Sequence, residues 1–237
     1  MVGTPRERAR AATMEEITRI GRVHLAEHGA AALSLRAVAR DLGVVSSAVY
    51  RYVASRDDLL TLLLVDAYGE LGDAVEAAVA RVPADRHRDR FLALGHAVRA
   101  WALAEPSRYA LLYGAPVPGY RAPEESTVEP GTRVPRTMVR IAADALAAGA
   151  LDEPTPAVDE PVPAALGVGL DAIREQFDVA LPDDLLVRGV LAWSAVFGCV
   201  SFEVFGQYGP DRLGDPDALF ERHLAVLADD LGLRAGG

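Results

Sequence analysis

The sequence predicts an all-α protein. Apolar residues recur at the three- and four-residue spacing of amphipathic helices through most of the chain, and capping residues or glycines separate the segments. No segment shows β-strand alternation of useful length. With 237 residues, of which 51% are hydrophobic, the chain can bury a substantial core. We therefore expect a small three-helix domain at the N-terminus and a larger helical domain after it.

The first helix is expected over residues 6–28. Ile17, Ile20 and Leu25 share one face of it, and Gly29 follows as a stop signal.

Two short helices follow the first. Ser34 is placed to cap a helix that ends at Gly43, and Ser46 or Ser47 is placed to cap the next, which reaches about Val53. The N-terminal segment therefore contains three helices separated by glycine turns.

A fourth, longer helix begins at the sequence SRDD. Ser55 stands at its N-cap and Asp58 three residues later, which is a capping-box arrangement, and leucines continue the pattern to about Val82. The later helices are expected at about 88–104, 107–113, 137–150, 163–179, 182–208 and 215–231.

Two proline-rich stretches are expected to be long loops. Residues 114–136 hold five prolines and three glycines, and residues 152–163 hold four prolines among acidic residues. Loops of that length in a compact domain are usually functional or mobile.

Charge is distributed unevenly along the chain. The formal net charge is −10, yet residues 1–56 carry nine arginines against five acids, a balance of +4, and the remainder is strongly acidic. A small basic segment on an acidic body is typical of a contact module for a polyanion. The sequence shows no signal peptide, and its longest uncharged run, residues 189–202, is too short to span a bilayer, so we expect a cytoplasmic protein.

The three N-terminal helices match a helix-turn-helix, in which the second helix braces the DNA backbone and the third enters the major groove. Hydroxyls and phenols can donate to phosphates, and an arginine can reach a phosphate or chelate a guanine edge. The candidate DNA contacts on and beside the third helix are Arg36, Ser46, Ser47, Tyr50, Arg51, Tyr52 and Arg56. The alternative is a solvated helix face or, for one tyrosine, packing against the fourth helix.

The stretch ALSLRAVARDLGVVSSAVYRYVASRDDLL resembles the N-terminal domain of the tetracycline-repressor (TetR) family, and the resemblance covers roughly residues 12–62. The chain departs from the family pattern at four positions. Val45 stands where a serine or threonine cap is common, Tyr52 where histidine is frequent, Val53 where phenylalanine is common and Arg56 where lysine is usual.

The second half of the chain resembles one subgroup of the family's C-terminal regulatory domains. That subgroup often shows Trp-His-Gly in its later segment; here Trp193 and Gly198 are present, and Phe197 takes the region of the histidine. The resemblance implies a homodimer whose last two long helices, about 182–208 and 215–231, pack against their mates. The apolar character of the first of these on every side is consistent with that interface.

The resemblance implies that different parts of the chain have different functions. Residues 1–56 would bind DNA, residues 57–237 would bind a ligand and dimerise, and the helix at about 56–82 would link the two. The function expected is that of a ligand-responsive regulator, most simply a repressor, which binds a palindromic DNA operator as a homodimer and is released by a small, largely apolar effector.

The effector pocket is expected to be mostly apolar. Aromatic residues cluster on three of the later helices, and the lining predicted from them is His96, Trp101, Tyr109, Tyr113, Phe177, Trp193 and Phe197. The alternative is that these aromatic residues are ordinary core.

Other chemistry has little support in the sequence. There is no Gly-x-Ser-x-Gly motif, no glycine-rich phosphate loop and no cysteine beside a base, so catalysis is not expected. His24 and His28 have zinc-ligand spacing without an evident third ligand, so neither a metal nor another cofactor is expected. The competing function is a helical small-molecule-binding or enzymatic domain that retains a vestigial helix-turn-helix.

Overall fold

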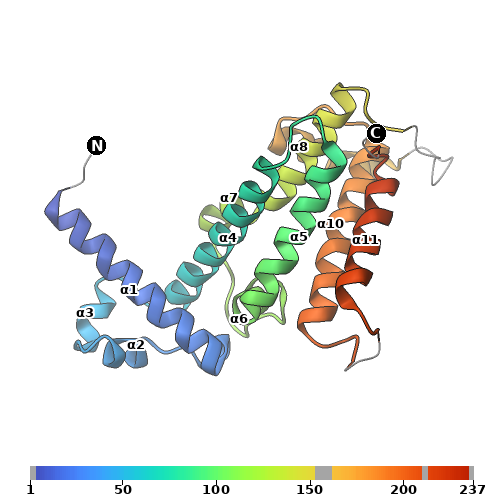
Figure 1. Cartoon of the computed structure of the whole chain (residues 1–237). Helices are drawn as coiled ribbons and strands as arrows, with labels where there is room; N and C mark the ends of the chain where they lie inside the picture. The colour runs from blue at the N-terminus through green and yellow to red at the C-terminus, as the bar shows by residue number, and fades with distance from the viewer. Residues whose placement is uncertain (1–3, 153–161, 210–212, 235–237) are drawn as a thin grey trace. The chain divides into compact units, whose positions relative to one another are not determined.

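A computed structural model describes residues 4–152, 162–209 and 213–234. The prediction of an all-α protein is confirmed: the described residues are helices and connections, with one isolated bridge between Leu151 and Leu233 (Figure 1). The chain packs as two compact units. Unit 1 comprises Met1–Glu70 and Glu105–Gly131, and unit 2 comprises Leu71–Ala104 and Thr132–Gly237.

Unit 1 contains the three N-terminal helices and a later segment of the chain. Its helices are α1 (Pro5–His28), the short 3-10 helix η1 (Ala30–Ala32), α2 (Leu35–Asp41), α3 (Ser46–Tyr50), the first part of α4 (Arg56–Ala80), α6 (Pro106–Tyr113) and α7 (Glu124–Gly131). Two caps fix helix starts. Thr4 and Glu7 form a capping box at α1, and the Ser55 hydroxyl accepts from the Asp58 amide at 3.1 Å at α4.

The core of unit 1 is aliphatic. Fully buried side chains from α1, α2, α3 and α4 meet in it, among them Ile17, Val38, Val49 and Leu59. Side chains from the later segment pack against the same core, namely Leu111, Val117 and Tyr120. The Tyr120 hydroxyl also lies 2.9 Å from the Thr61 hydroxyl, so the segment 105–131 is an integral part of unit 1.

The predicted loop over residues 114–136 is wrong in its second half. That stretch contains α7, and α8 begins at Arg133 rather than at residue 137. Pro135 lies in the first turn of α8, where its missing N–H leaves no helical hydrogen bond unmade, and Pro130 lies one residue before the end of α7. These prolines mark helix ends. The second predicted loop, residues 152–163, lies mainly outside the described residues.

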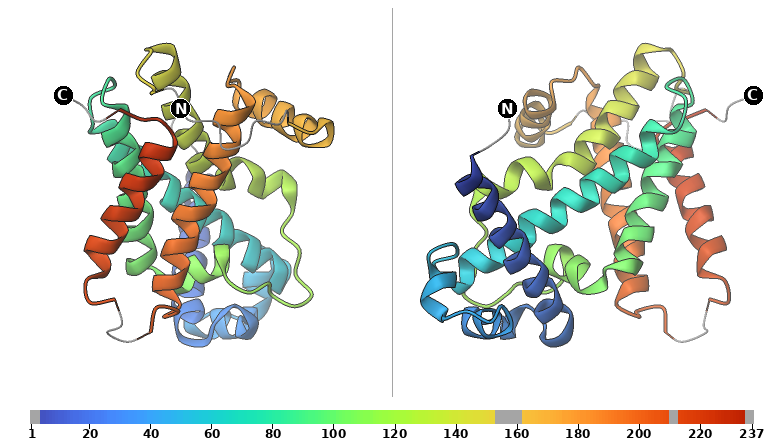
Figure 2. Two further views of the ribbon diagram at one scale, coloured as in Figure 1. Left: turned by 90° about the vertical axis from the view of Figure 1, so that its right-hand side faces the viewer. Right: turned by 60° about the vertical axis from the view of Figure 1, so that its left-hand side comes forward.

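Unit 2 contains the second part of α4 and five further helices. They are α5 (His87–Ala104), α8 (Arg133–Ala147), α9 (Ala164–Phe177), α10 (Asp183–Val204) and α11 (Pro216–Asp230). Helices α5, α10 and α11 pack side by side (Figures 1 and 2). The approach of α5 to α11 is close: a Cβ atom on Gly95 would lie 2.4 Å from a methyl carbon of Leu224.

Helix α10 has the length and the apolar composition of a membrane-spanning helix. Core helices of soluble proteins can have the same length and composition. One side of it is packed within unit 2, with Ala192, Val196 and Val200 fully buried. The helix also has exposed large apolar side chains, namely Val187, Val190, Leu191, Trp193 and Phe202.

The acidic C-terminus of α11 is held by arginines from two neighbouring helices. Arg88 of α5 lies 2.5 Å from the Asp229 carboxylate and donates to the Leu233 carbonyl at 2.9 Å. Arg188 of α10 donates to the carbonyl and the carboxylate of Asp230. Two acids at a helix C-terminus oppose the helix dipole, and the guanidinium groups offset that repulsion while satisfying terminal carbonyls.

Candidate nucleic-acid interface

The turn between α2 and α3 is built by a glycine. Gly43 has φ +70°, a left-handed conformation that a side chain disfavours, and its amide donates to the Arg40 carbonyl at 3.0 Å. The next amide, from Val44, donates back to the Ala39 carbonyl at 3.0 Å. The chain therefore leaves α2 in a compact turn and starts α3 at Ser46.

Helix α3 is anchored by one residue, and two of its other four residues are exposed, as is Arg51 directly after it. Val49 is 2% exposed and faces the core of unit 1, whereas Ser47, Tyr50 and Arg51 are exposed. The helix ends at Tyr50, earlier than the predicted Val53, and Arg51 and Tyr52 form a turn after it.

The seven predicted DNA contacts divide by exposure. Arg36, Ser47, Tyr50 and Arg51 have exposed side chains, with Tyr50 44% exposed, and Ser46 is half-buried. Exposed phenol, hydroxyl and guanidinium groups on one short helix and its neighbour can reach phosphates and base edges.

The remaining two residues already have partners within unit 1. Tyr52 packs against the core, and the guanidinium of Arg10 lies 5.3 Å from the centre of its ring. Arg56 donates to the Ala30 and Ala31 carbonyls at 3.0 and 3.2 Å. Both side chains therefore help to hold α1, η1 and α4 around α3.

His24 has a structural partner that the sequence did not reveal. Its side chain is buried, and Nε2 lies 2.6 Å from a carboxylate oxygen of Asp41 at the end of α2. The hydrogen bond from His24 lowers the pKa of Asp41 below its usual value. The pair ties α1 to the helix that precedes the turn. Within the described ranges, no group of three or more His, Cys, Asp or Glu residues is placed to hold a metal ion.

A cluster of five charged residues joins α1, α4 and α6, and we call it the ion cluster. Arg22 donates to both carboxylate oxygens of Asp66, at 2.6 and 2.8 Å, and the buried Arg108 donates to Asp66 at 3.0 Å. Glu70 lies 2.8 Å from Arg108 and 3.3 Å from Arg22, and Glu105 lies 3.5 Å from Arg108. The four-residue spacing of Asp66 and Glu70 on a leucine-rich helix is the sequence signal that could have pointed to it.

The predicted effector residues are distributed over both units. In unit 1, Tyr109 is fully buried and its ring centre lies 5.1 Å from that of Tyr113. Burial raises the pKa of the Tyr113 phenol, and the Tyr68 ring, which was not predicted, lies edge-on to Tyr113 at 6.2 Å. These tyrosines therefore form a packed aromatic cluster.

In unit 2 the predicted residues come from three helices, α5, α9 and α10. Trp193 and Phe197 are edge-on neighbours on α10, with ring centres 6.3 Å apart. Phe177 is buried at the end of α9. His96 and Trp101 line an open hollow of about 590 Å³ whose other walls are alanines of α4 and α5 and Arg81.

His96 is engaged beside this hollow. Its Nε2 lies 2.8 Å from the Glu221 carboxylate of α11, and its ring is edge-on to Phe220 at 6.0 Å.

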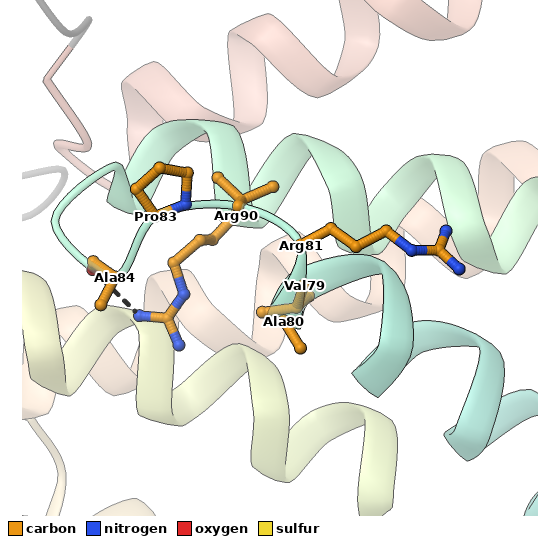
Figure 3. A pocket seen from close by; sticks show the side chains of 7 residues that line it. Val79, Ala80, Arg81, Pro83, Ala84 and Arg90 are labelled. Carbon is orange, nitrogen blue, oxygen red and sulfur yellow. Dashed lines mark hydrogen bonds between the residues drawn. The ribbon is translucent and has the colours of Figure 1, made fainter.

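A second hollow, of about 430 Å³, lies at the connection between α4 and α5 and contains none of the predicted residues. Arg90 reaches across it, donating to the Ala84 carbonyl at 3.4 Å and to Asp144 at 2.8 Å, whereas Arg81 points away (Figure 3). Arg90 therefore serves the packing of α5 against α8.

The compact turn, the anchored short helix and its exposed polar side chains define a helix-turn-helix protein. Residues 17–63 match the family model for bacterial regulatory proteins of the tetR family, and residues 91–227 match the tetracyclin repressor-like C-terminal domain. The chain belongs to the tetR family of transcriptional regulators and is a DNA-binding regulator rather than an enzyme.

Relatives and solved structures agree with this assignment. The HTH-type transcriptional regulators Rv1816 of Mycobacterium tuberculosis and Mb1846 of Mycobacterium bovis are each 47% identical over 232 residues, covering 96% of this chain and 97% of the relative. The crystal structure of regulatory protein SCO4313 is 36% identical, with a TM-score of 0.75, and covers 95% of this chain and 100% of its own. PfmR of Thermus thermophilus, at 14% identity and a TM-score of 0.52 over 93% and 99% of the two chains, shares the fold.

Proposed function

We propose that the protein is a ligand-responsive repressor that binds a palindromic DNA operator as a homodimer. The observation that carries the proposal is the set of exposed side chains on and beside α3, namely Arg36, Ser47, Tyr50 and Arg51. They lie in the segment of the chain whose charge balance is positive, although the whole chain is acidic. Ser46, Tyr52 and Arg56 are partly buried, and their part in DNA binding stays a prediction. The second and third helices of the motif would then meet phosphates and base edges in the major groove.

A second copy of the chain accounts for the exposed apolar side of α10. Val190, Leu191 and Trp193 are each between 39% and 55% exposed, and Val226 of α11 is 65% exposed. Large apolar side chains gathered on two adjacent helices are typical of an interface between subunits. A two-fold dimer would hold two copies of α3 about 34 Å apart, which is one turn of the duplex.

A small, largely apolar effector is proposed to release the operator. Such a ligand acts only if it binds one arrangement of the dimer more tightly than the other. The residues proposed for it in unit 2 are His96, Trp101, Phe177, Trp193 and Phe197, and the part assigned to Tyr109 and Tyr113 of unit 1 stays a prediction.

The functional division follows from these assignments. Residues 1–56 bind DNA, residues 57–237 bind the effector and dimerise, and α4 links the two functions. The protein works in the cytoplasm, where its operator is. The likeness of the C-terminal domain to the Trp-His-Gly subgroup, carried by Trp193 and Gly198, belongs to the same proposal.

The proposal is tested by measuring the binding of the protein to two kinds of DNA. One is the set of duplexes that the protein selects from a random-sequence pool, and the other is the DNA flanking its own gene. Fluorescence anisotropy should show affinity that falls steeply between about 50 and 200 mM salt. Arg51→Ala should weaken binding at every salt concentration and flatten the salt dependence, because it removes a cation. Arg140→Ala, an exposed arginine on α8, should change neither. Failure to bind any duplex at any salt concentration would favour a helical binding domain with a vestigial helix-turn-helix.

A further inference from the structure

The turn before α3 exposes two valines. Val45 is 72% exposed and Val44 is 42% exposed, although the neighbouring valines Val49 and Val53 are buried in the core of unit 1. Val45 also occupies the N-cap position of α3, with extended backbone and no side-chain hydrogen bond to the helix. A serine, threonine, aspartate or asparagine would accept a hydrogen bond from a free amide there, and valine cannot.

Val45 therefore breaks two local rules at once. It leaves the helix start uncapped by a side chain, and it places a branched apolar side chain in water without adding to the core. Residues that oppose the local preference without a gain in packing are expected where the protein meets its partner. The contact that Val45 can make with a partner is an apolar one.

Double-stranded DNA presents one apolar group of matching size in its major groove, the C5-methyl group of thymine. The flanking side chains, Ser46, Ser47 and Tyr50, are those proposed to meet phosphates and base edges, so Val45 lies among the groups that face the duplex. We infer that Val45 contacts a thymine methyl group and makes the operator carry a thymine at that position of each half-site. This inference rests on the proposed function and adds to it a specificity-determining residue.

Replacing thymidine by deoxyuridine in the duplex removes only the methyl group of the base and leaves base pairing unchanged. The wild-type protein first selects duplexes from a random-sequence pool, and each selected thymine is then replaced, in both half-sites together, by deoxyuridine. Burial of one methyl group corresponds to about a fourfold change in affinity for each half-site. At one symmetric pair of positions, we expect the wild-type protein to bind the deoxyuridine duplex about fifteenfold more weakly.

The informative variant is Val45→Ser, which should bind the thymine and deoxyuridine duplexes equally at that pair of positions. Because serine is a favoured N-cap residue, the variant should melt at the same temperature as the wild type or higher, which separates loss of discrimination from loss of folding. Val168→Ser is the matched control. Val168 is also 72% exposed, but it lies on α9 in unit 2, so this variant should keep the full preference for thymine.

The outcomes separate this inference from the proposed function. If the pool yields no bound duplex, the proposed function itself fails. If duplexes are selected but contain no fixed thymine, or if deoxyuridine is tolerated at every position, DNA binding stands and the methyl contact is overturned. Retention of the wild-type preference by Val45→Ser also overturns it, because another residue must then read the methyl group.

Discussion

Arg108 of α6 donates a hydrogen bond of 3.0 Å to the carboxylate of Asp66 on α4, and Arg22 of α1 donates to the same carboxylate. Arg108 is 3% exposed, and the three carboxylates around it balance its buried charge. Three helices of unit 1 that are distant in sequence are thus held by one carboxylate shared between two cations. The Arg22 guanidinium donates to both oxygens of Asp66, and this bidentate contact fixes the relative orientation of the two side chains.

Arg108→Leu should destabilise the protein by roughly 2–3 kcal/mol. Removing the buried cation leaves Arg22 as the one cation of the ion cluster against Asp66, Glu70 and Glu105. The partial exposure of these acids keeps the effect below that of a fully buried pair. Urea unfolding followed by circular dichroism measures the change. Arg19→Ala is the control, since the Arg19–Glu16 pair on α1 is largely exposed and should contribute under about 0.5 kcal/mol. Equal losses in the two variants would show that the ion cluster does not hold unit 1.

Gly95→Ala should lower the free energy of unfolding by about 1–3 kcal/mol. Alanine is favoured over glycine within a helix by up to about 1 kcal/mol, but the added Cβ would lie 2.4 Å from Leu224, so the steric cost prevails. Adding Leu224→Ala should recover much of the Gly95→Ala loss, which a double-mutant cycle measures.

Gly169→Ala on α9 is the matched control for this pair. A Cβ there would meet nothing within 4 Å, so this change should leave stability unchanged or raise it. Destabilisation by Gly169→Ala, or strict additivity of Gly95→Ala and Leu224→Ala, would contradict the close approach of α5 and α11.

Asp41→Asn should weaken the folded state at neutral pH and lose its effect in acid. The pKa of Asp41 is lowered in the folded protein, mainly by the hydrogen bond from His24. The stabilisation is therefore present above the pKa of the unfolded state, about 3.9, and disappears as the pH falls through the lower folded value. The difference in unfolding free energy between the wild type and the variant, measured from pH 7 to pH 3, should shrink as the pH falls below about 3.9.

Glu15→Gln, a change at an exposed acid on α1, is the control for this pH dependence. Its difference from the wild type should stay near zero throughout. A constant gap between Asp41→Asn and the wild type down to pH 3 would mean that the interaction with His24 does not favour the ionised carboxylate.

Tyr50→Phe should weaken DNA binding about fivefold for each half-site, whereas Tyr52→Phe should leave it nearly unchanged. The Tyr50 phenol is on the exposed side of α3, and one hydrogen bond to a phosphate contributes about 1 kcal/mol. Tyr52 instead packs against the core with Arg10 over its ring, a contact that phenylalanine can keep. Anisotropy titrations with a selected duplex distinguish the two, and a larger loss in Tyr52→Phe would reverse the assignment.

Local signals in the sequence located most helices. The cap at Ser55 and the stop at Gly29 lie where the sequence places them, because each acts within a few residues of itself. The predicted cap at Ser46 or Ser47 is wrong, because the N-cap residue of α3 is Val45. The same locality explains the error at residues 114–136. A run of prolines predicts a loop, although Pro135 fits the first turn of a helix without loss.

Contacts between distant segments could not be predicted in the same way. The spacing of His24 and His28 is that of metal ligands, but the true partner of His24 is Asp41, which lies 17 residues away on another helix. The acids at the end of α11 likewise oppose the helix dipole, and the sequence does not show that Arg88 and Arg188 lie beside them. The exposed side of α3 was predictable because it follows from helical periodicity. Which of the aromatic residues lie together depends on tertiary packing.

The chain contains two tryptophans, and their surroundings differ sharply. Trp101 is 7% exposed within unit 2, whereas Trp193 is 39% exposed on α10, on the side proposed to meet a second copy. The protein therefore carries its own pair of fluorescent reporters, and no dye is needed to follow assembly. Collisional quenching by acrylamide should act on the α10 indole once dilution separates the subunits, while the indole of α5 stays shielded until the fold itself opens.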